Sequence, residues 1–115
     1  MYKDEIDYKK GIAHLAGKKE IYIRIANVFI TSGEEKIKDL KEFFANGDFE
    51  RLTIEFHGLK SSAASVGSTL LPEVSIELEA AGKRGDNEFI KERFDAFIEQ
   101  YEDTCKALGQ VIEQL

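Results

Sequence analysis

The sequence predicts an all-α protein, an antiparallel four-helix bundle with additional short N-terminal helices. Three observations support this prediction. Apolar residues recur at steps of three and four along most of the chain. Most glycines and the single proline, Pro72, fall near expected helix ends. No stretch of useful length alternates between apolar and polar residues as a strand would. Amphipathic helices joined by short turns pack as an antiparallel bundle.

The N-terminal part of the sequence predicts three helices. A short helix is expected over residues 4–14, and a second over residues 19–31, where apolar residues repeat at helical spacing. Ser32 is expected to cap a third helix, because Glu35 follows three residues later as in a capping box. Asn46-Gly47 is expected to end this helix, since both residue types are common at helix C-termini.

The C-terminal part predicts three longer helices. The fourth helix is expected over residues 48–67, with Asp48 as its N-cap. The fifth is expected over residues 71–85 and starts at Leu71-Pro72, because proline is tolerated in the first turn. The sixth and longest is expected over residues 86–115, with Asp86 as its N-cap and a continuous apolar stripe.

Length and composition limit the classes of protein. The 115 residues suit one domain, over residues 1–115. The formal net charge of −6 argues against nucleic-acid binding, which needs clustered lysine and arginine. No apolar stretch approaches the ~20 residues of a membrane span, so no membrane partner is expected. The single cysteine, Cys105, excludes an internal disulfide framework, and it falls on an apolar stripe that favours packing. We expect a cytoplasmic monomer.

The surroundings of His57 are unusual for a helix surface. At ~100° per residue, His57 lies about 130° from the centre of its helix's apolar face, so its imidazole is expected outside the core. Lys60 lies one turn away and is expected to bring a positive charge close to it. Small residues are expected to keep this face open to a partner: Gly58, Ser61, Ala64 and Gly67. Glycine and serine weaken a helix, which makes access to His57 the simplest reason for them.

Two other interpretations of this stretch stay open at this point. A lone exposed histidine is usually an ordinary polar surface residue. The small residues could instead allow close packing against another helix, because Lys60 is the one charged residue between His57 and Gly67.

The run around His57 resembles the signature of the histidine-containing phosphotransfer (HPt) domain family. That signature is roughly His-x-Leu-Lys-Gly, followed by small residues and a second glycine. Here it is His57-Gly58-Leu59-Lys60-Ser61, then Ala63-Ala64 and Gly67. Other stretches similar to the family are residues 7–12, Ile21-Tyr22 with Phe29, Asn46-Gly47-Asp48, residues 78–81 and Gly85-Asp86. Ser61 stands where the family usually has glycine, one turn from His57.

The resemblance implies a phosphocarrier of a two-component phosphorelay that is not an enzyme by itself. His57 would accept a phosphoryl group from the aspartyl phosphate of a receiver domain and pass it to another receiver. Lys60 would stabilise the phosphoryl oxygens. The chain would need no cofactor, because Mg²⁺ would come from the receiver partner. The expected partners are response-regulator receiver domains, a hybrid sensor histidine kinase, or both.

Two rival functions come from the same residues. The first is a non-catalytic helical adaptor that docks a signalling partner through the small-residue face. The second is a metal-binding or catalytic helical protein with His14, His57 and Cys105 as possible donors. The sequence disfavours this second function and predicts no metal site, because it contains no His-x-x-x-His or Glu-x-x-His pair.

Overall fold

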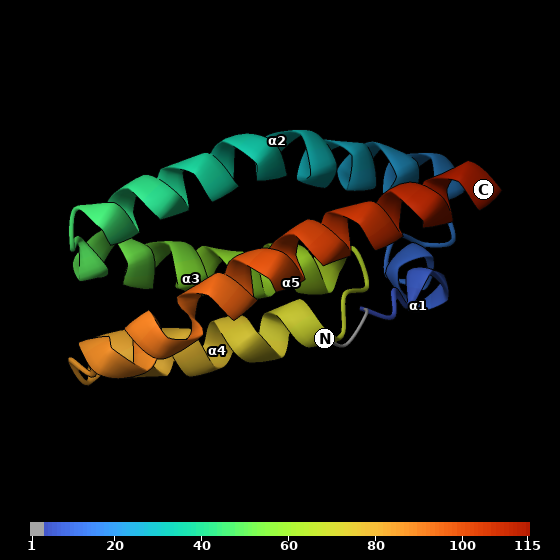
Figure 1. Ribbon diagram of the computed structural model, residues 1–115. Helices are drawn as coiled ribbons and strands as arrows, with labels where there is room; N and C mark the ends of the chain where they lie inside the picture. Colours follow the sequence, from blue (N-terminus) through green and yellow to red (C-terminus); the bar gives the residue numbers. More distant parts are fainter. Residues whose placement is uncertain (1–3) are drawn as a thin grey trace.

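The computed structural model describes residues 4–115 and contains five α-helices within them (Figure 1). The helices are α1 (Tyr8–Ala13), α2 (Lys19–Ala45), α3 (Phe49–Ser65), α4 (Leu70–Lys83) and α5 (Asn87–Gln114). The one β-type contact in the described range is an isolated bridge between Ile6 and Ser68. The predicted all-α fold class is confirmed. No helix within residues 4–115 is both long enough and apolar enough to cross a membrane.

Helices α2 to α5 form the bundle, and α1 is a short addition near the end where α5 finishes (Figure 1). Around the bundle the helices follow the order α2, α3, α4, α5, and α5 packs back against α2. Aromatic side chains from three of these helices meet in the core. The rings of Phe56 and Phe97 are 5.1 Å apart edge to face, and those of Phe44 and Phe94 stack at 4.1 Å.

The predicted break at Ser32 is wrong, because residues 19–45 form one continuous helix. The Ser32 hydroxyl does not cap a helix; it donates to the carbonyl of Phe29, one turn earlier. The neighbouring Gly33 is buried inside α2 and faces α5. A Cβ at Gly33 would lie 3.0 Å from Cys105 Sγ and 3.4 Å from the Tyr101 ring. This glycine therefore serves close packing between two helices and does not end one.

The predicted N-caps at Asp48 and Asp86 are confirmed. The Asp48 side chain accepts a hydrogen bond from the backbone N–H of Arg51, and the Asp86 side chain accepts one from Phe89. Both carboxylates thereby satisfy a backbone donor that the first turn leaves without an intrahelical partner. The predicted starts of α3 and α5 follow from these caps.

The start of α4 has a cap that the sequence analysis missed. Asp4, expected to open the first helix, lies outside it, because α1 starts only at Tyr8. The Asp4 carboxylate is buried, and its Oδ1 accepts hydrogen bonds from the backbone N–H groups of Thr69 and Leu70. Its Oδ2 accepts from the hydroxyls of Ser68 and Thr104. The N-terminal segment therefore ties α4 to α5.

Candidate functional site

His57 lies on the solvent side of α3. The buried face of this helix consists of Leu52, Phe56, Leu59 and Ala63. The side chain of His57 is 63% exposed. The orientation predicted from helical periodicity is therefore confirmed, and the imidazole stands outside the core.

Glu79 of α4 holds the imidazole from the side of the bundle. Its Oε2 lies 2.5 Å from His57 Nδ1, although the Glu79 side chain is only 6% exposed. Helices α3 and α4 can approach this closely because Gly82 has no side chain. A Cβ at Gly82 would lie 1.9 Å from Thr53 Oγ1 on α3.

Two lysines share the same carboxylate. Lys60 Nζ lies 3.0 Å from Glu79 Oε1, and Lys83 Nζ lies 3.2 Å from Glu79 Oε2. The hydrogen bond from Lys60 is the largest cause of a Glu79 pKa of about 2, well below the usual value. Burial acts in the opposite direction, and the contacts with His57 and Lys83 lower the pKa further. Glu79 is therefore ionised throughout the physiological pH range.

An ionised carboxylate at Nδ1 determines which imidazole nitrogen is free to react. A carboxylate only accepts hydrogen bonds, so Nδ1 must carry the proton in this contact. In the neutral ring, Nε2 then has an unshared electron pair. The arrangement gives an exposed imidazole with a defined tautomer, which suits attack by Nε2 on an electrophile brought by another molecule.

The small-residue face is open at three of its four predicted positions. Gly58, Ser61 and Ala64 are all exposed, and a Cβ at Gly58 would meet nothing within 4 Å. No helix within residues 4–115 covers them, so they do not serve internal helix packing. Gly67 was predicted to belong to this face, and that prediction is wrong, because Gly67 is buried.

The backbone explains the position of Gly67. Its φ of +88° is in the left-handed region that favours glycine, and it lies just after the end of α3. A Cβ there would lie 2.4 Å from the carbonyl oxygen of Asp7. The Asp7 N–H donates to the Gly67 carbonyl at 2.8 Å. Gly67 therefore ends a helix beneath the N-terminal segment.

Exposed aliphatic side chains flank the histidine, and the sequence analysis did not single them out. Ile54 is 64% exposed and precedes His57 by one turn of α3. Ile76 is 52% exposed and precedes Glu79 by one turn of α4. Both lie outside the core-facing stripe of an otherwise amphipathic helix, which is the signal that could have identified them.

The structure does not bring the proposed metal donors together. Within residues 4–115, no group of three or more His, Cys, Asp and Glu side chains is arranged to hold a metal ion. His14 lies at the C-cap of α1, whereas Cys105 lies on α5 beside Gly33 of α2. Burial, followed by the charges of Glu102 and Glu34, raises the pKa of Cys105 to about 11.

The fold and the site define a helical bundle that presents one exposed histidine held by a buried carboxylate. Comparison with known proteins agrees with this class: the family model of the Hpt domain matches residues 24–114. The chain therefore belongs to the Hpt domain family, and its function is histidine phosphotransfer in a phosphorelay, as a phosphocarrier.

A solved structure shares this fold. The crystal structure of histidine-containing phosphotransfer protein B (HptB) from Pseudomonas aeruginosa PAO1 superposes with a TM-score of 0.76 at 24% sequence identity. The match covers 95% of this chain and 91% of that one. A comparison with curated proteins finds no match.

Proposed function

We propose that His57 is the residue that carries the phosphoryl group, accepted from the aspartyl phosphate of one receiver domain and passed to another. One observation carries the proposal: the exposed imidazole is held at Nδ1 by the buried, ionised carboxylate of Glu79. The chain has two histidines, and the other, His14, takes part in none of the ion pairs found within residues 4–115.

The proposed transfer begins with the neutral imidazole of His57, because only the neutral ring has an unshared electron pair at Nε2. Nε2 attacks phosphorus, the bond between phosphorus and the aspartyl oxygen breaks, and the receiver carboxylate leaves with the electron pair. The ring keeps its proton at Nδ1 and gains positive charge, which the Glu79 carboxylate stabilises. Transfer to a second receiver reverses these steps. The attacking and leaving atoms must lie roughly in line, which requires open space above His57.

Lys60 is proposed to stabilise the phosphoryl oxygens. Its ammonium group bonds Glu79 at 3.0 Å, and its side chain is 33% exposed. An ammonium group has three donors, so a bond to Glu79 leaves donors for a phosphoryl group on His57. The carboxylate nearest His57 is already paired with two lysines, so Mg²⁺ is proposed to come from the receiver. We propose that the chain itself holds no cofactor and has no catalytic activity without a partner.

The receiver is proposed to dock over the exposed face around His57. Gly58, Ser61 and Ala64 leave room for its active-site loops, and Ile54 and Ile76 offer apolar contacts on two neighbouring helices. The donor is proposed to be a free response regulator or the receiver domain of a hybrid sensor histidine kinase. We propose a monomer in the cytoplasm that, with a net charge of −6, does not bind nucleic acid.

The test is transfer of labelled phosphate from a receiver domain loaded with acyl phosphate. The unaltered chain should acquire acid-labile, base-stable label. His57→Gln should acquire none, whereas His14→Gln is the matched control and should be labelled like the unaltered chain. Label on His57→Gln would refute the assignment. Receiver binding without any label on the unaltered chain would favour the adaptor function.

A further inference from the structure

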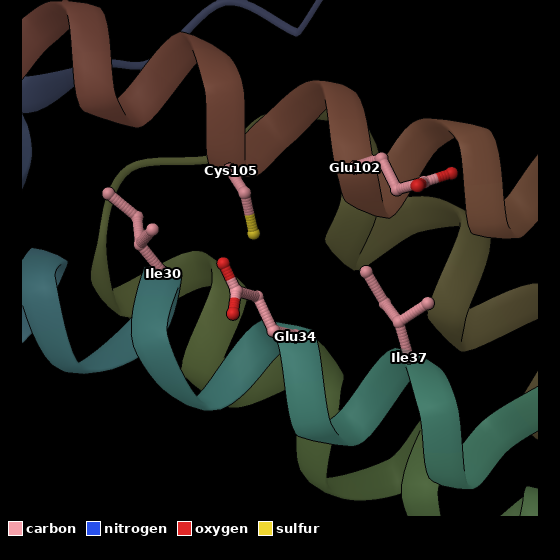
Figure 2. A pocket seen from close by; sticks show the side chains of 5 residues that line it. All are labelled: Ile30, Glu34, Ile37, Glu102 and Cys105. Atoms are coloured by element: carbon pink, nitrogen blue, oxygen red, sulfur yellow. The ribbon is translucent and has the colours of Figure 1, made fainter.

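Two hollows lie one after the other between α2 and α5. The first has a volume of about 350 Å³ and is lined by Ile30, Glu34, Ile37, Glu102 and Cys105 (Figure 2). The second has a volume of about 420 Å³ and is lined by Lys41, Phe44, Phe94, Asp95, Ile98 and Glu99. The lining residues follow each other at helical spacing on both helices, so the two hollows lie along the same face of the bundle. We call these eleven residues the α2–α5 groove.

The floor of the α2–α5 groove is apolar. In Figure 2, Cys105 points from α5 toward α2, and Ile30 and Ile37 rise from α2 on either side of Glu34. These three floor residues are only partly buried. At the far end of the groove, Phe44 is partly buried and stacks on Phe94, which is buried in the core. Apolar side chains that remain partly exposed along two neighbouring helices form a surface that can be buried by another element.

The rim of the groove is acidic. Four exposed carboxylates and one lysine line it, and the carboxylates belong to Glu34, Asp95, Glu99 and Glu102. None of the four takes part in the salt bridges found within residues 4–115. The negative charges of Glu102 and Glu34 also act on the floor, because they raise the pKa of Cys105 in addition to burial. A partner whose apolar surface covers the floor would therefore bind more tightly if it carried positive charges beside that surface.

We propose that the α2–α5 groove binds an amphipathic helix of a partner protein, with an apolar stripe on the floor and lysine or arginine against the rim. The stretch of α2 from Ile30 to Phe44 covers about 21 Å at 1.5 Å per residue, which matches a helix of about four turns. This mode, an amphipathic helix in an apolar groove, is a common form of protein recognition.

Other occupants fit the rim less well. A second copy of this chain would bring like-charged rims together, and the net charge of −6 opposes such pairing. An anionic lipid surface would be repelled for the same reason. The groove lies on the face of the bundle opposite α3 and α4, which carry His57 and Glu79 (Figure 1). A helix in the groove would therefore leave the histidine free, and the proposal does not depend on the proposed function of His57.

The test uses a synthetic peptide of 16 residues as the probe, with leucines on one helical face and lysines beside them. A second peptide carries glutamates in place of the lysines. Binding is measured by fluorescence anisotropy with the full chain. The lysine peptide should bind saturably, and the glutamate peptide should not. The double variant Glu34→Lys/Glu102→Lys should weaken the lysine peptide about tenfold and should gain affinity for the glutamate peptide, since each rim contact has a modest effect.

Controls locate the binding on the chain. Glu50→Lys/Glu77→Lys makes the same charge change on α3 and α4 and should alter the affinity less than about twofold. Circular dichroism checks that both double variants keep the helix content of the unaltered chain. Cys105 is the only cysteine, so its reaction with a thiol reagent reports directly on the groove floor. Saturating lysine peptide should slow that reaction.

Several results would overturn the proposal. One is no saturable binding of the lysine peptide up to about 1 mM. Others are equal weakening by the two double variants, or a Cys105 reaction rate that the peptide leaves unchanged. Sedimentation equilibrium provides a further check: a dimer of the unaltered chain that Glu34→Lys/Glu102→Lys dissociates would assign the groove to a second copy.

Discussion

Replacing Asp4 with alanine removes a buried carboxylate that joins the N-terminal segment to α4 and α5. Oδ1 accepts from the N–H groups of Thr69 and Leu70, which are backbone donors at the start of α4. Oδ2 accepts from the hydroxyls of Ser68 and Thr104. We expect Asp4→Ala to be the most destabilising change of an N-capping carboxylate in this chain.

The magnitude follows from the donors that lose a partner. Loss of a helix N-cap costs about 0.5–2 kcal/mol. Ser68 is buried, and its hydroxyl loses its acceptor, which costs about 1–3 kcal/mol. Thr104 adds little, because its hydroxyl also has the Gln100 carbonyl at 2.9 Å. The total expected loss in the free energy of unfolding is about 2–4 kcal/mol, or about 10 °C in Tm for a chain of this size.

The assay is denaturant and thermal unfolding followed by circular dichroism, with Asp7→Ala as the matched control. Asp7 caps the six-residue helix α1 by accepting one exposed hydrogen bond from the backbone N–H of Lys10, so its loss should cost about 1 kcal/mol or less. Equal destabilisation by Asp4→Ala and Asp7→Ala would show that the Asp4 hydrogen bonds do not stabilise the start of α4.

The remaining predictions concern the site and the glycine that ends α3. Glu79→Ala should slow phosphotransfer to His57 about tenfold or more, because Nδ1 loses its acceptor; an unchanged rate in a rapid-quench assay would remove Glu79 from the mechanism. Lys60→Ala should slow transfer about tenfold to hundredfold with little change in Tm, and an equal rate would contradict its role. Ala64→Arg should weaken receiver binding about tenfold by bulk without lowering Tm, which titration calorimetry and thermal unfolding will check. Gly67→Ala should lower the free energy of unfolding by about 2 kcal/mol or more, because the φ of Gly67 is +88° and a Cβ there would lie 2.4 Å from a carbonyl oxygen. Unfolding and titration calorimetry separate the two outcomes. The Glu79 pKa of about 2 lies below that of an unfolded glutamate. The ionised carboxylate of Glu79 therefore stabilises the fold fully above about pH 4.5, and this contribution is lost as the pH falls toward 2. The difference in the free energy of unfolding between the unaltered chain and Glu79→Gln should shrink over that window.

The orientation of His57 could be predicted because it depends on one helix alone. Phe56 and Leu59 lie on the same side of α3, and a helical period then places His57 on the other side whatever packs around it. The caps at Asp48 and Asp86 were predictable for a similar reason, since the side chain bonds a backbone N–H three residues later. Local geometry determines such features.

The continuity of α2 depends on a partner helix. Ser32 and Glu35 satisfy the pattern of a helix start, and Gly33 adds a residue that weakens helices. Burial against Tyr101 and Cys105 of α5 outweighs that local preference. Likewise, Gly67 belongs to a run of small residues, but its burial follows from the Asp7 carbonyl above it, sixty positions away in the chain.

The sequence by itself determined the helical class, the outward direction of His57 and the small residues around it, because each follows from a 3.6-residue period and from side-chain size. Only the tertiary structure decided that Glu79 holds the imidazole and that two lysines share its carboxylate. Lys83 lies one turn from Glu79 on α4 itself, but the contacts of Glu79 with His57 and Lys60 join α3 to α4 across 22 and 19 positions of the chain. They arise because Gly82 lets the two helices approach, and a spacing between helices is set by packing of the whole bundle.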